Sequence, residues 1–132
     1  FSMVAEMVEA ALREHAGLRR RRLPGVLAAL GAEIFTKYPA PAGEADDFWP
    51  RAGALLRERL EETQARPPRP VREMPDPAAR SVFEIMPIHK DVITLDYDYI
   101  FNFMRMNLLR AHEDFLKAAR PAELVDDLLG RA

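Results

Sequence analysis

The sequence contains no cysteine. This absence excludes disulfide bonds, thiolate catalysis and zinc sites built on sulfur ligands, and it is typical of a cytoplasmic protein, which is the compartment we expect. Long apolar runs are also missing, since none approaches the roughly 20 residues that a membrane-spanning helix needs. The N-terminal residues show no secretory signal pattern. We therefore expect no membrane partner.

An excess of charge of one sign is missing as well. The chain has 19 Lys and Arg against 21 Asp and Glu, which gives a formal net charge of −2. A nearly neutral chain has no overall field that gathers nucleic acid, and we expect no nucleic-acid binding. The one basic run, from Arg19 to Arg22, lacks the interleaved aromatic residues of single-strand binders. We interpret this run as a solvated linker between two helices.

The residues of known catalytic and metal-binding motifs do not occur together. The 6 glycines are scattered and form no phosphate-binding loop. None of His15, His89 and His112 lies in a Glu-x-x-His or His-Glu-x-x-His motif. Asp96 and Asp98 are two positions apart, so on a helix they point about 200° away from each other. We predict no metal site, no cofactor and no catalytic residues, and we do not expect an enzyme.

What the sequence does contain is helical periodicity. We treat the 132 residues as a single helical domain and interpret residues 1–2 as a remnant of a removed tag. Apolar spacing predicts helices over 3–16, over 24–38, from about 46, from after Asp91 or Thr94 to about 119, and over 121–130. The fold class is therefore all-α, an irregular bundle of about five helices. We expect the long fourth helix to run through its middle.

The segment from 64 to 78 differs from its surroundings because it contains five prolines. Proline excludes regular helix and central strand, so we predict an extended, polyproline-like connection between the third and fourth helices. The apolar residues that follow fit either a helical turn or an extended piece, and the pattern leaves both open. They are Val82, Phe83, Ile85, Met86 and Ile88.

Two apolar sets lie on the long fourth helix. One alternates by four and three residues like a heptad seam: Tyr97, Phe101, Met104, Leu108, Ala111, Phe115 and Ala118. The second set lies outside the seam: Phe103, Met106, Leu109 and Leu116. A helix that is apolar on more than one side is central in its domain or shared with a partner. Our leading hypothesis is a non-catalytic protein-interaction or regulatory domain that self-associates as a homodimer through this second set.

A line of polar residues runs beside the seam. Asp98, Arg105 and His112 are seven residues apart, and Asn102 lies one turn beyond Asp98. The second hypothesis is a small-molecule-binding domain in which these four residues and the rings of Tyr97 and Phe101 line a cavity for a small apolar ligand. The alternative is that the polar residues pair locally at the solvent boundary. A third hypothesis is a small helical enzyme with His112 or Asp98 as acid or base.

Overall fold

The computed structural model describes residues 2–85 and 93–130, and within these ranges the chain is helical with no strand. The all-α prediction is confirmed, and each of the predicted helices is present. The elements, in order, are α1 (Ser2–Ala16), η1 (Gly17–Arg22), α2 (Leu23–Phe35), α3 (Phe48–Gln64), η2 (Val71–Glu73), α4 (Asp76–Ile85), α5 (Ile93–Ala118) and α6 (Pro121–Leu129), where η marks a 3₁₀ helix.

Helix α1, and not the long helix α5, is the central element. It contacts α2, α3, α5 and α6, and it contributes a residue to each of three buried apolar clusters. Leu12 packs with residues of α2 and α6, Ala5 packs with α3, and Met7 packs with Met74 and with Leu108 of α5. Because Met7 lies on the opposite side of the helix from Ala5 and Leu12, α1 is buried on two sides.

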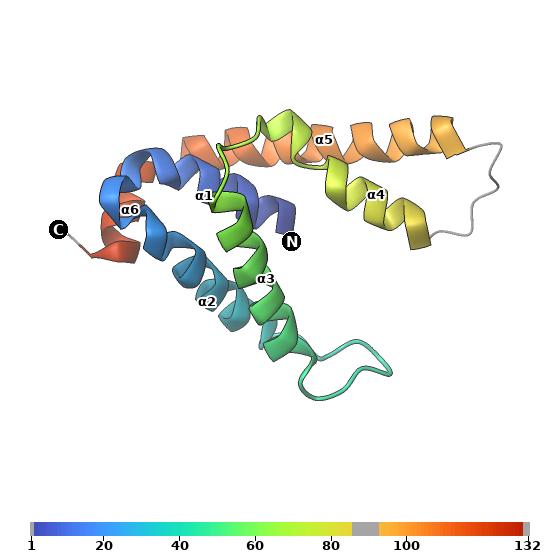
Figure 1. Ribbon diagram of the computed structural model, residues 1–132, viewed down its shortest axis with the longest axis horizontal. Helices are drawn as coiled ribbons and strands as arrows, with labels where there is room; N and C mark the ends of the chain where they lie inside the picture. Colours follow the sequence, from blue (N-terminus) through green and yellow to red (C-terminus); the bar gives the residue numbers. More distant parts are fainter. Residues whose placement is uncertain (1, 86–92, 131–132) are drawn as a thin grey trace.

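Helix α5 lies along one edge of the molecule (Figure 1), so our expectation that it runs through the middle was wrong. Its heptad seam does face inward: Leu108 is buried, and the seam residues from Tyr97 to Phe115 are at least half-buried. The C-terminal part of α5 packs on α1, and α4 lies beside its N-terminal part (Figure 1). One side of α5 therefore carries all of its packing.

The proline-rich connection is only partly extended. Pro70 has φ −55° and ψ 137°, which are polyproline-like values, but η2 follows at once and α4 begins at Asp76. The prediction that prolines exclude helix up to residue 78 was wrong because Pro77 lies in the first turn of α4, where a missing N–H costs nothing. The apolar residues that follow are helical as far as Ile85, and Met86 and Ile88 lie outside the described residues.

The four consecutive arginines do link α1 and α2, and Arg20 to Arg22 are exposed, but the run also has a packing role that we did not predict. They belong to η1, and two of them bind the C-terminal end of α6. Arg19 forms an ion pair with Asp126 at 2.8 Å and donates a hydrogen bond to the carbonyl of Gly130. Arg22 donates to the carbonyl of Leu129 at 2.8 Å. Since the last carbonyls of a helix lack partners within it, these guanidinium groups satisfy them and offset the negative end of the helix dipole.

Candidate docking surface on helix α5

Three large apolar side chains on successive turns of α5 are exposed to solvent. Tyr99 is 74% exposed, Phe103 is 63% exposed and Met106 is 68% exposed. Their spacing of four and then three residues places them on one side of the helix. Exposed apolar residues that occur singly are ordinary, but a contiguous group of them marks an interaction surface.

These three residues line one shallow groove together with three polar ones. Asn102, Asn107 and Arg110 complete the lining, and the groove has a volume of about 410 Å³. We call these six residues the α5 docking face: Tyr99, Asn102, Phe103, Met106, Asn107 and Arg110. The face has an apolar centre, with amide groups beside it and one positive charge at one end, which is the usual composition of a protein–protein contact.

The docking face is uncovered because α4 packs on the opposite side of α5. Tyr97 is the centre of that packing: its ring meets Phe83 edge-on at 5.7 Å and stacks against Phe101 at 6.1 Å. The Arg80 guanidinium lies 5.9 Å from the centre of the same ring. The Tyr97 hydroxyl donates a hydrogen bond to the Asp76 carboxylate. Tyr97 and Phe103 are six residues apart, so their side chains project about 120° away from each other around the helix.

The contact between α4 and α5 shifts two pKa values. The hydrogen bond from Tyr97, together with Arg80 at 2.9 Å, lowers the pKa of Asp76 below its usual 3.8. Burial raises the pKa of Tyr97 above 10.0, and the hydrogen bond to Asp76 raises it further. Both shifts favour the observed pair, a carboxylate that accepts and a neutral phenol that donates.

The residues predicted for an interface divide between two places. Phe103 and Met106 lie on the docking face, and both are exposed. Leu109 is half-buried. Leu116 is 47% exposed, but it lines a different groove. Half of the predicted set is therefore found on one continuous surface.

The residues predicted for a ligand site do not share one groove either. Asn102 lies on the docking face, whereas His112 lines the groove that contains Leu116. The Arg105 guanidinium lies 5.6 Å from the centre of the Phe101 ring, and Asp98 is exposed. Tyr97, predicted as an apolar wall, faces α4 instead, as described above.

The groove at His112 lies between α1, the segment from 68 to 74 and α5. Its volume is about 430 Å³, and His15 and Glu14 of α1 line it together with His112. The structure thus brings two histidines that are far apart in sequence to one groove beside α5. In the described part of the chain no three His, Asp or Glu side chains are arranged so that they could hold a metal ion. The hypothesis of a small-molecule site beside this helix stays a prediction.

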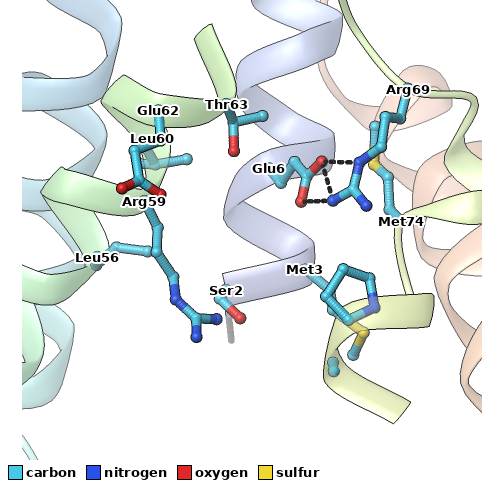
Figure 2. A pocket seen from close by; sticks show the side chains of 12 residues that line it. Ser2, Met3, Glu6, Leu56, Arg59, Leu60, Glu62, Thr63, Arg69 and Met74 are labelled. Atoms are coloured by element: carbon cyan, nitrogen blue, oxygen red, sulfur yellow. Dashed lines mark hydrogen bonds and ion pairs between the residues drawn. The ribbon is translucent and has the colours of Figure 1, made fainter. Parts of the chain in front are cut away.

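A further cavity, of about 240 Å³, lies between α1, α3 and α4 and contains charges of both signs (Figure 2). The Nη2 atom of Arg69 donates to both oxygens of the Glu6 carboxylate, at 2.7 and 2.8 Å, and its Nε atom donates to Oε1 at 3.0 Å. On the other side of the cavity Arg59 extends toward Ser2, and Glu62 lies above it (Figure 2). Two guanidinium groups and two carboxylates offset each other, so the lining favours neither an anion nor a cation. The Glu6–Arg69 pair ties the proline-rich connection to α1.

Sequence reasoning missed several residues of both the docking face and the interior. Tyr99, Asn107 and Arg110 belong to the docking face, and the signal for them was present, because they continue the spacing of Phe103 and Met106 by steps of three and four. Glu9 of α1 is the residue of the interior that sequence spacing did not indicate. It is fully buried, and it accepts hydrogen bonds from Arg13 and from Gln64 of α3 at 2.8 Å.

Comparisons with known proteins place no family on this chain: no protein-family model, no curated protein and no solved structure matches it. Among the described residues no helix has both the length and the apolar character needed to cross a membrane. The functional argument therefore depends on the chain's own surface.

Proposed function

We propose that this chain is a protein-interaction domain that forms a homodimer through the α5 docking face. The observation that carries the proposal is the exposure of Tyr99, Phe103 and Met106 on consecutive turns of a side that no other element in residues 2–85 and 93–130 covers. Burying such side chains stabilises a complex by about 1.5–3 kcal/mol for each one fully removed from water. Pairing with a second copy of the chain would bury that surface.

Other exposed apolar residues do not carry the same argument. Leu55 of α3 is 60% exposed, which is close to the value for Phe103, but Arg51, Glu58 and Arg59 occupy the neighbouring positions on its side of α3. A single exposed leucine among charges is ordinary for a monomer. Leu55 therefore provides a matched control for any variant of the docking face.

A second copy suits the docking face better than an unrelated partner because the face is complementary to itself. It offers one aromatic ring and one guanidinium at its two ends, and one asparagine on each side of its apolar centre. Symmetric pairing about a two-fold axis is the commonest arrangement of soluble homo-oligomers, and it requires such a self-complementary patch. A face of this size supports a modest interface of roughly 1,000 Å² and a dissociation constant in the micromolar range.

The test is the substitution Phe103→Glu compared with Leu55→Glu. We expect sedimentation equilibrium of the wild type to show a monomer–dimer equilibrium, and Phe103→Glu to raise the dissociation constant at least about 30-fold, because a buried unpaired carboxylate costs several kcal/mol. Leu55→Glu places the same charge on an equally exposed position and should leave the equilibrium unchanged.

Circular dichroism of both variants checks that the helices are intact. A wild type that stays monomeric at several hundred micromolar overturns the proposal. So does a dimer that Leu55→Glu weakens as much as Phe103→Glu does.

A further inference from the structure

We infer that the two copies pair with their α5 helices antiparallel, about a two-fold axis between Phe103 and Met106; this inference rests on the proposed homodimer. In this register Tyr99 faces Arg110 of the partner subunit, and Phe103 faces Met106 of the partner subunit. Asn102 and Asn107 lie about 140° apart around the helix, one on each side of the apolar centre, so they flank these contacts and do not pair with each other. Tyr99, Phe103, Met106 and Arg110 thus each meet another member of the same face.

The spacing of the face makes this register available. Its six residues are separated by steps of three, one, three, one and three, a series that reads identically in both directions. A two-fold axis perpendicular to the helix at the middle of the series therefore places Tyr99 level with Arg110 of the partner subunit and Phe103 level with Met106 of the partner subunit. Helices in a bundle pack at interaxial distances of about 8–10 Å, which side chains of these sizes span.

The chemistry of each exchanged pair is favourable. A guanidinium over a tyrosine ring gains a cation–π interaction, and a methionine sulfur at the edge of a phenylalanine ring is an attractive contact. The Asn107 Nδ2 atom already donates to the Phe103 carbonyl of its own helix at 2.8 Å. The hydrogen-bonding capacity of Asn107 is thus partly used within its own helix.

The parallel arrangement of the same two helices is less favourable. It places Arg110 against Arg110 of the partner subunit, and like charges in contact across an interface oppose association. It also separates Tyr99 from any cation on the face, because Arg110 is its one charged member. Antiparallel pairing replaces that repulsion with an attraction and places the helix dipoles in opposite directions. Orientation is therefore determined by where the one positive charge lies.

A charge exchange tests the register. Arg110→Glu places a carboxylate on the tyrosine ring, and Tyr99→Arg places one guanidinium on another, so each single variant should raise the dissociation constant about 10-fold. The double variant Tyr99→Arg/Arg110→Glu creates two Arg–Glu pairs across an antiparallel interface. Its dissociation constant should return to within about 3-fold of the wild type. In a parallel dimer the double variant would hold two like-charged contacts, as many as Tyr99→Arg alone, so its dissociation constant would not return toward that of the wild type.

An independent distance measurement uses the absence of cysteine. The substitution Lys117→Cys introduces the one cysteine of the chain, and a nitroxide spin label can be attached to it. Lys117 is exposed and lies two turns beyond the docking face. At 1.5 Å per residue, antiparallel pairing separates the two labelled positions by about 38 Å, whereas parallel pairing brings them within about 15 Å. Double electron–electron resonance spectroscopy measures the distance between the two labels and so distinguishes the two arrangements.

The outcomes separate the two proposals. A wild type without dimer in sedimentation overturns the homodimer itself. A dimer that Phe103→Glu dissociates but whose labels lie within 15 Å, or whose charge-exchanged double variant dissociates as readily as Tyr99→Arg, leaves the homodimer standing and overturns the antiparallel register. Recovery in the double variant together with the long distance supports both.

Discussion

Glu9 and Arg13 of α1 form a buried ion pair, which is the feature of single residues that most affects stability. Glu9 is fully buried and Arg13 is 9% exposed. Arg13 also donates to the carbonyl of Arg66 at 2.8 Å, beyond the end of α3. The pair therefore satisfies its own hydrogen-bonding groups and ties α1 to the end of α3. Removing one partner would leave the other charge buried without compensation.

We expect Arg13→Ala to reduce the free energy of unfolding by about 3–5 kcal/mol, because the Glu9 carboxylate then stays buried without its cation. The double substitution Glu9→Leu/Arg13→Met should cost much less than the single one, since it removes both charges and keeps apolar volume. Urea unfolding measures both. Arg57→Ala is the matched control, because the Arg57–Glu61 pair has the same spacing but is 63% and 54% exposed at its two side chains.

The control variant Arg57→Ala should change the free energy of unfolding by less than about 1 kcal/mol. Equal losses for Arg13→Ala and Arg57→Ala would contradict a structural role for the buried pair. The sequence did not predict this role, because the i, i+4 spacing of Glu9 and Arg13 is the same as that of an ordinary surface pair. Only the position of α3, which covers them, distinguishes the two cases.

At the scale of elements, α4 is the helix that the sequence concealed. Five prolines between 64 and 78 predicted an extended chain, yet two of them border or open α4, and a proline in a first turn is compatible with helix. The heptad seam of α5 was predicted correctly. What covers its N-terminal part was not, since Tyr97 and Phe101 fit a ligand cavity as well as they fit packing against a neighbouring helix.

The attachment of α4 should depend on pH through Asp76. Its folded-state pKa lies below 3.8, so the contact contributes stability above pH 3.8 and loses it as pH falls through the folded-state pKa. Because Asp76→Asn has no carboxyl group to titrate, the stability difference between wild type and variant should shrink toward zero on acidification below that pH. Urea midpoints from pH 7 to pH 2.5 measure the difference.

Other carboxylates titrate in both proteins, so the difference between them isolates Asp76. A constant difference across the range would contradict the account. Tyr97 works in the opposite direction: its pKa is raised, so its contribution is present below pH 10 and is lost as pH rises through the folded-state value.

At the scale of the whole molecule, burial is divided among three small clusters around α1, and α5 lies along one edge (Figure 1). The main helices other than α4 could be predicted from apolar spacing alone, because each of them has at least one strong apolar stripe. Which helix is central could not, since α1 and α5 are both apolar on two sides. Of these two helices, α1 has small residues such as Ala5 and Ala16, which allow neighbouring helices to approach closely on one side. Helix α5 instead carries Phe103 and Met106 on its second side, and both side chains are exposed to solvent.

The exposed side of α5 was therefore visible in the sequence as a second apolar set, but its exact members were not. Leu109 and Leu116 face toward other elements or another groove, and Tyr99 and Arg110 take their place on the docking face. To decide which of these residues are exposed, one must know the direction from which α1 and α4 approach α5. Sequence spacing does not contain that direction.

The most direct test of the central claim is the concentration dependence of the amide spectrum of the wild-type chain. Nitrogen–proton correlation spectra recorded from about 20 µM to 1 mM cover a micromolar equilibrium. The account predicts progressive shifts at residues 98–111 of α5, with α2, α3 and α6 unchanged. Spectra that do not change with concentration, or whose shifts cluster on α3 or α6 while α5 stays constant, would contradict it.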